Sequence, residues 1–365
     1  MSQKIKVSVL GATGMVGQNF LRLLHGHPWF QIVDVAASPR SAGKTYADAA
    51  GKNWFMSSEI PTEIKNLIVR EAKDFDTIPE EVKCVFSAMD LPDKGDTREL
   101  EFSYAKAGYP IVSTSSANRG TDDVPMIIPE INPDHADVIP IQQANRGLPN
   151  TGFVAVKPNC SIQSYLVTLA ALENAGFPVN QVQVTSLQAV SGAGQTGIQS
   201  KEMKDNVIPF IAGEEEKTEN EPLKILGTVS EKGILNYNQI NISAVCTRVS
   251  VIDGHTAVIH VSFRKKVPSI EKIKSIWTKY TAFPQEAGLP LAPKNPIIYL
   301  EDENRPQPKI DRDVDKGMAV SVGRLAEENF FDIRYVALSH NTVRGAAGGA
   351  ILMAELLAEK GYIYA

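Results

Sequence analysis

The sequence predicts an α/β protein in which a parallel sheet with helices on both faces is joined to a second unit built on a mixed sheet. Short apolar runs alternate with helical segments over the first 160 residues, a pattern typical of a parallel sheet. Beyond residue 160 the strand-like segments are longer, β-branched and partly alternating, which favours a mixed or antiparallel sheet. A length of 365 residues is enough for two such domains.

Composition and charge exclude several classes of protein. The 37 Lys and Arg residues against 42 Asp and Glu give a net charge of −5, whereas a nucleic-acid platform needs surplus cations. The 43% apolar content argues against wholesale disorder. No uncharged apolar run reaches the roughly 18 residues of a membrane span. The N-terminus carries no signal-peptide core, so a cytoplasmic location is expected.

The first half of the chain supplies the predicted parallel sheet. An apolar run at 5–10 has the character of a buried parallel strand. A glycine turn follows, and then apolar residues recur at helical spacing until Pro28 ends the helix. These apolar residues are Val16, Phe20, Leu23 and Leu24. Further strands are expected at 31–36, 82–88, 111–113 and 153–156, with a helix at 98–107.

The second half supplies the predicted mixed sheet. A helix is expected at 162–174, followed by long strands at 182–190, 245–251 and 257–263. The segment 290–308 is rich in proline and charge, which indicates an extended surface loop. An Ala-, Gly- and Leu-rich helix at 342–359 ends the pattern and can return to pack on the first unit.

The glycine turn is the first feature that points to a ligand. Gly11, Gly14 and Gly17 directly follow the first strand and open the first helix. Glycines allow a tight turn and close approach to a pyrophosphate, and the helix N-terminus offers N–H donors. The spacing is GxxGxxG rather than GxGxxG, but the strand–turn–helix context is that of a Rossmann-type dinucleotide site.

The end of the second strand indicates which dinucleotide is bound. Asp34 lies inside the strand, too early to meet a ribose 2′-hydroxyl as the acidic residue of NAD-preferring sites does. The loop that follows carries hydroxyls and cations that suit a 2′-phosphate. They are Ser38, Arg40, Ser41 and Lys44. The sequence therefore predicts NADP.

Cys160 is the candidate nucleophile. The three cysteines have neither disulfide nor zinc spacing, and no metal site is expected. Cys84 and Cys246 lie within apolar strands and are predicted to be core residues. Cys160 follows Asn159 between a strand and an amphipathic helix, where a helix N-terminus lowers a thiol pKa. We therefore expect a thiolate at Cys160.

His255 and Arg248 are candidate partners of that thiol. His255 follows Asp253 and Gly254 at a predicted turn between two strands, and Arg248 lies seven residues earlier on the incoming strand. A histidine can move a proton and an arginine can clamp a carboxylate, so one cleft with both suits acyl chemistry on an acidic substrate. By spacing alone, either residue can also be structural.

Taken together, these motifs resemble the aspartate-β-semialdehyde dehydrogenase family in its archaeal and fungal type. The resemblance rests on GATGMVG at 11–17, PNC at 158–160, QAVSGAG at 188–194 and the spacing of Arg248 to His255, and covers nearly the whole chain. It implies a Rossmann-type NADP-binding domain of residues 1–159 plus 341–365. It also implies an inserted α+β catalytic and dimerisation domain on a mixed sheet, residues 160–340, and a homodimer or homotetramer.

The resemblance further implies a reaction. L-Aspartyl 4-phosphate would be reduced with NADPH to L-aspartate 4-semialdehyde, reversibly, with release of phosphate, in lysine, threonine and methionine biosynthesis. Cys160 matches the nucleophile that forms a thioester, and His255 matches the acid/base residue. Gln188 matches the glutamine that orients the intermediate, and Arg248 the arginine that holds the α-carboxylate.

The remaining site residues are also implied by the resemblance. Asn159 and Arg119 match phosphate-binding positions. Glu221 and Lys224 match a Glu-x-x-Lys pair, with the glutamate near the substrate amine and the lysine near phosphate. The implied cofactor contacts are Gly11, Thr13, Gly14, Met15 and Val16 on the pyrophosphate, Ser38, Arg40 and Ser41 on the 2′-phosphate, Ser87 and Ala88 by the ribose, and Asn341 and Gly345 towards the nicotinamide. Ser191 and Gly192 are further implied cofactor contacts.

Other functions remain open at this point. Malonyl-CoA reductase and N-acetyl-γ-glutamyl-phosphate reductase share the architecture, but the first must accommodate a bulky thiol and the second has no free amine to bind. A non-catalytic NADP sensor would not need Cys160, His255 and Arg248 together. A Cys–His hydrolase would leave the glycine turn unexplained.

Overall fold

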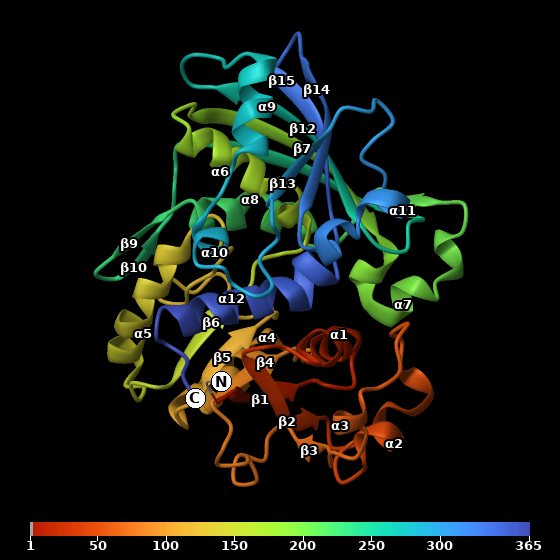
Figure 1. Cartoon of the computed structure of the whole chain (residues 1–365), viewed down its shortest axis with the longest axis vertical. Helices are drawn as coiled ribbons and strands as arrows, with labels where there is room; N and C mark the ends of the chain where they lie inside the picture. The colour runs from red at the N-terminus through yellow and green to blue at the C-terminus, as the bar shows by residue number, and fades with distance from the viewer. Residues whose placement is uncertain (1–2) are drawn as a thin grey trace.

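The computed structural model describes residues 3–365, which form two large sheets joined by a shared core, and a separate two-stranded hairpin (Figure 1). The first sheet has six parallel strands in the order β3-β2-β1-β4-β5-β6. Their bounds are β1 Ile5–Leu10, β2 Phe30–Ala37, β3 Arg70–Glu71, β4 Cys84–Ser87, β5 Pro110–Ser113 and β6 Phe153–Val156. The predicted strands at 5–10 and 153–156 agree with the structure residue for residue.

Helices cover both faces of this sheet. They are α1 Met15–Leu24, α2 Tyr46–Ala50, α3 Thr62–Lys65, α4 Lys94–Lys106, α5 Ile139–Arg146 and, from the other end of the chain, α12 Gly348–Glu359. The last of these packs on α1 and β5, below the second sheet in Figure 1. Buried Glu355 of α12 contacts His27 Nε2 at 2.8 Å and accepts the N–H of Leu291. The C-terminal helix thus completes the cover of the first sheet.

The second sheet has seven strands in the order β13-β14-β15-β12-β7-β11-β8. Their bounds are β7 Val179–Ala189, β8 Val207–Ile208, β11 Asn241–Val249, β12 His255–Phe263, β13 Ile297–Leu300, β14 Val320–Glu327 and β15 Ile333–Ser339. The β7–β11 and β13–β14 pairs are parallel, whereas β12 runs antiparallel to both β7 and β15. The predicted mixed sheet is confirmed.

One face of the second sheet is covered and the other is open. Helices α6 Leu166–Asn174 and α9 Ile270–Thr278 lie against the covered face, where Trp277 packs on Tyr335. Along β12 every second residue is buried, while Val258 and His260 point to the opposite side and stay partly exposed. Val245 of β11 is 46% exposed. This face has no covering helix among residues 3–365.

Helix α8 Glu214–Ile225 borders β11 at the edge of the second sheet. Strand β8 covers only the end of β11, at Arg248 and Val249. Further along the same edge, Glu215 and Glu219 of α8 accept the N–H groups of Cys246 and Ala244. These bonds fix the orientation of α8 relative to the sheet.

Several predicted elements differ from the structure. The segment 290–308 contains the edge strand β13, hidden in the sequence by the prolines around its four residues. The helix expected at 162–174 is a short 3-10 turn, Ser161–Ser164, separated from α6 by Tyr165 at φ −134°. The helix expected at 342–359 begins as a π-turn, Val343–Ala347, before α12. His255, placed in a turn by the sequence, is the first residue of β12.

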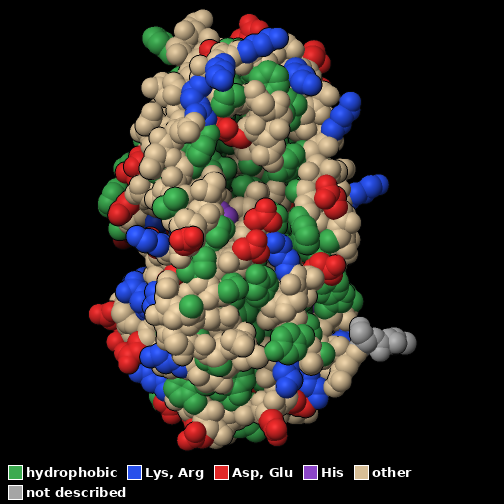
Figure 2. All heavy atoms as spheres, turned by 90° about the vertical axis from the view of Figure 1, so that its left-hand side faces the viewer, with side chains coloured by type: hydrophobic (Ala, Val, Ile, Leu, Met, Phe, Trp, Pro, Cys, Tyr) green, Lys and Arg blue, Asp and Glu red, His purple; other side chains and the backbone are tan. Residues whose placement is uncertain are grey.

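The remaining elements are short. They are the β9 Thr228–Ser230 and β10 Gly233–Leu235 hairpin, α7 Gly194–Ile198, α10 Phe283–Glu286 and α11 Pro308–Asp311, with 3-10 turns at Gly51–Asn53, Pro133–Val138, Val190–Ala193, Lys201–Met203 and Val314–Gly317. None of the helices from residue 3 onward is long and apolar enough to cross a membrane. Charged side chains of both signs are mixed over the face seen in Figure 2, in keeping with the small net charge.

Candidate active site

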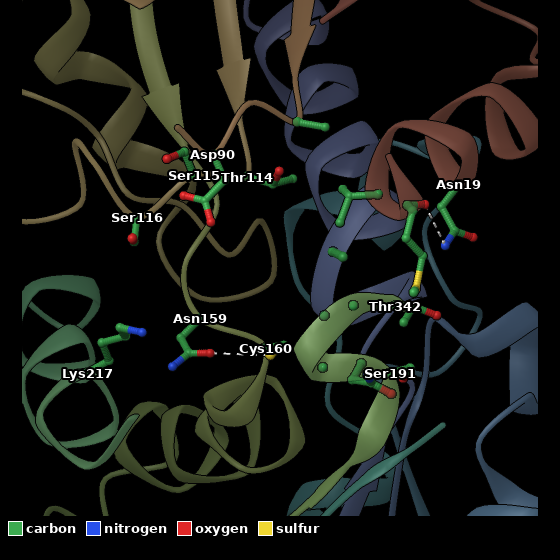
Figure 3. Close-up of a pocket in the computed structure, with 18 of the residues that line it drawn as sticks. Asn19, Asp90, Thr114, Ser115, Ser116, Asn159, Cys160, Ser191, Lys217 and Thr342 are labelled. Atoms are coloured by element: carbon green, nitrogen blue, oxygen red, sulfur yellow. Dashed lines mark hydrogen bonds between the residues drawn. The ribbon is translucent and has the colours of Figure 1, made fainter. Parts of the chain in front are cut away.

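A cavity of about 300 Å³ lies between the two sheets, where the carboxyl ends of the parallel strands face the second unit. Its wall comes from distant parts of the chain, including the start of α1, the loops after β4 and β5, and the start of α8. Cys160, Ser191 and Asn341 also line it, and Figure 3 shows several of these residues around the space. A ligand here would touch both units at once.

Cys160 is the one cysteine that reaches this cavity. Its Sγ lies 3.3 Å from Nε2 of His255 and 3.3 Å from Oδ1 of Asn159. Cys84 and Cys246 are fully buried in β4 and β11, as their apolar surroundings predict. A sulfur nucleophile beside an imidazole is the arrangement that covalent acyl transfer requires.

The backbone of Ala189 holds both His255 and Arg248. The Ala189 N–H donates to Nδ1 of His255 at 3.0 Å, and the Ala189 carbonyl accepts from Nη1 of Arg248 at 2.9 Å. This is possible because β11 and β12 both pair with β7, which ends at Ala189. The neutral imidazole therefore carries its proton on Nε2, the nitrogen that faces Cys160.

Gly192 lies directly over these two side chains. A Cβ at this position would stand 2.7 Å from Nη1 of Arg248 and 3.1 Å from Cε1 of His255. A side chain here would push the Arg248 guanidinium and the imidazole aside, and the same segment lines the cavity through Ser191, Gly192 and Gly194.

The charge states of the pair follow from burial. Burial, and then the Arg248 cation, lowers the pKa of His255 to about 3. Burial and the Glu214 carboxylate raise the pKa of the Cys160 thiol above its ordinary value, against the opposing effects of nearby cations. The predicted resting thiolate is therefore wrong. The 3-10 turn that follows Cys160 is too short to supply the expected helix dipole.

Glu214 and Lys217 form a charged pair at the cavity wall, on the side that carries Asn159. Both residues line it, and Nζ of Lys217 lies 2.9 Å from Oε1 of Glu214. Oε2 of Glu214 accepts from the Asn159 amide at 2.9 Å and from the Gln188 amide at 3.1 Å. Burial opposes ionisation of Glu214, but Lys217 and these amides lower its pKa below the ordinary value. In Figure 3 Lys217 extends from α8 towards Asn159.

Glu221 and Arg119 brace the wall behind the nucleophile. Oε1 of Glu221 accepts from Nη1 of Arg119 at 2.9 Å, and Oε2 accepts the N–H of Asn159. Arg119 also donates to the carbonyls of Thr114 and Lys157 while lining the cavity. The guanidinium is thus held in place by the loops after β5 and β6, the second of which carries Cys160.

The start of α1, directly after the glycine turn, forms the other end of the cavity. Gly14 caps α1 without a side-chain hydrogen bond, so the first-turn N–H groups remain open to an anion, and Met15 and Val16 line the cavity. Gly11 has φ +71°, and a Cβ there would lie 2.7 Å from the carbonyl oxygen of Ala88. The turn therefore requires glycine at Gly11.

The end of β2 is arranged as the sequence suggested. Asp34 is buried and paired with Arg70 at 2.8 Å, and it also accepts from Ser8, so it is not open to a ribose. Ser38 and Arg40 are exposed on the loop that follows. Ser41 is partly exposed on the same loop.

Two protein-family models match this chain. Residues 6–139 match the family model described as "Semialdehyde dehydrogenase, NAD binding domain", and residues 169–344 match "Semialdehyde dehydrogenase, dimerisation domain". The chain is 43% identical to the aspartate-semialdehyde dehydrogenase of Methanothermobacter thermautotrophicus over 97% of its length and 99% of the relative's. It belongs to the aspartate-semialdehyde dehydrogenase family.

Other relatives agree with this assignment. The aspartate-semialdehyde dehydrogenase of Schizosaccharomyces pombe is 43% identical, over 98% of both chains. The crystal structure of aspartate semialdehyde dehydrogenase with NADP from Candida albicans superposes with a TM-score of 0.87 at 38% identity, covering 99% of this chain and 100% of that one. The predicted family resemblance, with its archaeal and fungal texture, is confirmed.

The Glu-x-x-Lys pair predicted to bind the substrate, Glu221 and Lys224, does not face the cavity in this family member. Lys224 donates to the carbonyls of Arg119, Thr121 and Val124 at 2.8, 2.6 and 2.8 Å, which uses all three of its protons. It is therefore not open to phosphate, and Glu221 faces Arg119 rather than the cavity. The same spacing occurs seven residues earlier as Glu214 and Lys217, and this pair lines the cavity.

Two further residues predicted to contact a ligand are buried away from the cavity. Ser87 is fully buried and its hydroxyl donates to Glu101, so its side chain does not face a ribose. Gln188 is 1% exposed and orients Glu214 instead of lining the cavity. Several other predicted residues do line the cavity: Met15, Val16, Ala88, Arg119, Asn159, Cys160, Ser191, Gly192, Asn341 and Gly345.

Asn341 and Gly345 bring the end of the chain to the nucleophile. Asn341 donates to Ser191 Oγ at 2.8 Å and accepts the N–H of Gly254, the residue before His255. A Cβ on Gly345 would stand 2.9 Å from Cβ of Cys160. The segment before α12 therefore needs glycine to pass so close to the sulfur.

Proposed function

We propose that this protein reduces L-aspartyl 4-phosphate to L-aspartate 4-semialdehyde with NADPH and releases phosphate, in the branch of metabolism that leads to lysine, threonine and methionine. The observation that carries the proposal is the 3.3 Å contact between Cys160 Sγ and His255 Nε2 at a cavity that also reaches the first turn of α1. Relatives at 43% identity over nearly the whole chain are named for this activity.

The residues present fit NADP. The open N–H groups at the start of α1 suit the pyrophosphate, and Ser38, Arg40 and Ser41 on an exposed loop suit the 2′-phosphate. The crystal structure of the relative from Candida albicans is that of the enzyme with NADP. When bound, the reduced nicotinamide supplies the hydride that reduces the thioester carbonyl.

The charges around Cys160 suit aspartyl phosphate. Arg248 has further N–H donors beyond the one on Ala189 and can clamp the α-carboxylate. Glu214 offers a carboxylate to the α-ammonium, and Lys217 supplies a cation for the phosphate. Asn159 and Arg119 add amide and guanidinium donors on the same wall.

The chain's own residues then divide the work. Cys160 attacks the acyl carbon and forms the thioester as phosphate leaves. Nε2–H of His255 points to the sulfur and so to the carbonyl oxygen bound next to it. Glu214 favours a free amine over the N-acetylated substrate, and Lys217 favours phosphate over a CoA thiol. The alternatives of malonyl-CoA and N-acetyl-γ-glutamyl-phosphate reduction are therefore not favoured.

The test follows nicotinamide absorbance with aspartate semialdehyde, NADP and phosphate. We expect phosphate-dependent formation of NADPH in the wild-type protein and none in Cys160→Ala. Absence of turnover in a protein that still binds NADP would refute the proposal, and the CoA ester and the N-acetylated phosphate would then be tried in turn.

The division of the chain and its assembly are also proposals. Packing of α12 on the first sheet supports a cofactor domain of residues 1–159 plus 341–365, with a catalytic domain of 160–340. The open face of the second sheet supports a homo-oligomer, a dimer or a tetramer. Val258→Asp on that face is expected to lower the mass measured by light scattering, and an unchanged mass would place the contact elsewhere. The three unpaired cysteines support a reducing, cytoplasmic compartment.

A further inference from the structure

Glu101 of α4 is buried at the ends of two parallel strands. It is 0% exposed, and no catalytic step proposed for this protein uses it. Its Oε1 accepts from the hydroxyl of Ser87, the last residue of β4, at 2.9 Å, and from the hydroxyl of Ser113, the last residue of β5. Its Oε2 accepts from the Asn118 amide at 2.7 Å. One carboxylate thus joins β4, β5 and the loop after β5.

The loops that leave these two strands both line the active-site cavity. Residues 88–90 directly follow β4 and residues 114–116 directly follow β5, and both ranges belong to the cavity wall. Arg119 also lines the cavity and comes directly after Asn118. Figure 3 labels Asp90 from the first loop and Thr114 from the second. Each group that Glu101 binds is therefore next in sequence to a residue of the cavity wall.

A second path leads from Glu101 to the Arg119 guanidinium through hydrogen bonds. The hydroxyl of Ser87 is bound to Glu101, and the Ser87 carbonyl accepts the N–H of Thr114 at 3.0 Å. The Thr114 carbonyl in turn accepts from Nη2 of Arg119 at 3.0 Å. A shift of Ser87 or Asn118 would thus reach Arg119 by two routes.

The carboxylate and its donors depend on one another. Burial raises the pKa of Glu101 above its ordinary value, and the two hydroxyls, the amide and the Arg119 cation oppose that rise. Oδ1 of Asn118 is buried without a hydrogen-bond partner among residues 3–365, so the bond from its Nδ2 to Glu101 is what holds this side chain. Loss of Glu101 would leave buried donors unsatisfied, which favours movement of the loops that carry them.

We propose that Glu101 is a positioning residue: its buried carboxylate holds the loops after β4 and β5, and so sets the Arg119 guanidinium for the phosphate of the substrate. This inference rests on the proposed function. Glu101 has no exposed surface and does not touch a ligand itself. A misplacement of about 1 Å at a binding group can cost about 100-fold in rate, so the effect should be visible in the use of phosphate.

Three variants separate this role from general support of the fold. Glu101→Met removes both acceptor oxygens. Glu101→Gln keeps Oε1 for the two serines but turns an amino group towards the Asn118 amide. The double variant Glu101→Gln/Asn118→Asp, called the swapped pair, exchanges amide and carboxylate and can form all three bonds again. Glu99→Met, at an exposed position of the same helix, is the matched control and should change nothing.

Hydrogen exchange of the free protein tests the positioning directly. We expect the backbone amides of residues 88–91 and 114–119 to exchange at least about 10-fold faster in Glu101→Met than in wild type, and near the wild-type rate in the swapped pair. If Glu101→Met does not fold, Glu101→Gln should show a smaller change in the same direction. Unchanged exchange in both loops of the folded variant overturns the inference. This measurement needs no substrate, so it does not depend on the proposed function.

Initial rates with aspartate semialdehyde, NADP and phosphate test the consequence for the site. We expect the KM for phosphate to rise about 10-fold in Glu101→Met, with kcat at saturating phosphate within about 3-fold of wild type, and to return towards the wild-type value in the swapped pair. In an Arg119→Ala background the same substitution should change this KM by less than about 2-fold, because the guanidinium that Glu101 positions is gone.

Two kinetic results would overturn the inference. One is an equal rise of the KM for phosphate with and without Arg119. The other is a lower melting temperature of Glu101→Met with an unchanged KM, which is what a merely structural role would give. Failure of the proposed function is a different result: the wild type itself would show no phosphate-dependent turnover, and hydrogen exchange alone would then decide whether Glu101 positions the two loops.

Discussion

Substitution of the lysine in each of the two Glu-x-x-Lys pairs on α8 should affect a different property of the protein. Lys217 borders the cavity, whereas Lys224 is buried on three backbone carbonyls two turns later. Replacing each lysine by methionine keeps the apolar stem and removes the charge. We expect Lys217→Met to impair phosphate use and Lys224→Met to impair stability.

The contacts give the size of each effect. Hydrogen bonds from a charged group contribute about 1.5–3 kcal/mol each, and three that share one donor are not additive, so Lys224→Met should cost roughly 3–5 kcal/mol. For a protein of 365 residues that is a fall in melting temperature of about 4–7 °C. Lys217 is 36% exposed in its side chain and pairs with Glu214, a contact worth roughly 0–1 kcal/mol.

The expected effect of Lys217→Met on phosphate use is larger than its effect on stability. Loss of one charged hydrogen bond to a bound phosphate corresponds to about a 10- to 100-fold fall in kcat/KM for phosphate. Thermal unfolding followed by circular dichroism, and initial rates over a range of phosphate concentrations, measure the two effects separately. Lys272→Met, at an exposed position on α9, is the matched control and should change neither.

The opposite pattern would refute this reasoning. If Lys224→Met kept its melting temperature and needed more phosphate, while Lys217→Met behaved as wild type, the later pair would be the ligand site. The three carbonyl contacts of Lys224 would then not describe the working protein.

Three further results are expected. In Gly192→Ala the kcat should fall at least about 100-fold with little change in melting temperature, because the new Cβ would lie 3.1 Å from Cε1 of His255. The control is Gly120→Ala, whose Cβ meets nothing within 4 Å and which should change neither kcat nor melting temperature. Alkylation of Cys160 by iodoacetamide in the free protein should keep accelerating above pH ~8.5, because a raised pKa moves thiolate formation to higher pH; a plateau below pH 8 would contradict this. Lys157→Met should leave that alkylation rate unchanged at pH 8.5, because burial lowers the pKa of Lys157 to about 7 and the amine is neutral there, and should slow it at pH 6, where the Lys157 ammonium favours the thiolate; a lower rate at pH 8.5 would contradict this.

Local patterns predicted the parts of the fold that depend on neighbouring residues. The apolar run before GATGMVG and the helical spacing after it gave β1 and α1 nearly to the residue. Arg248 lies near the end of β11 and His255, seven residues later, begins β12; both strands flank β7, so both side chains reach the end of that strand. The spacing of Arg248 and His255 was enough to predict that they lie together, because β11 and β12 pair with β7 in regular register near its end.

The misassigned residues depend on packing that no local pattern contains. Both Glu-x-x-Lys pairs have the same spacing on α8, and only the docking of α8, with Glu215 and Glu219 on β11, decides which pair faces the cavity. Likewise, the pKa of Cys160 depends on burial and on Glu214, which is 54 residues away in sequence. Four residues of β13 among prolines gave too short a pattern to predict.

The return of α12 to the first sheet affects how the protein is made. A ribosome releases the N-terminal strands first, yet the residues that complete their cover, and Asn341 and Gly345 of the cavity wall, follow only after the whole of 160–340. The first unit therefore exposes an apolar face during synthesis. The docking of α12 on this face forms contacts between residues far apart in sequence, and folding steps of this kind are slow. We therefore expect chaperones to bind this unit during translation. A chain that ends before residue 341 would carry the Cys160 thiol without a complete active site.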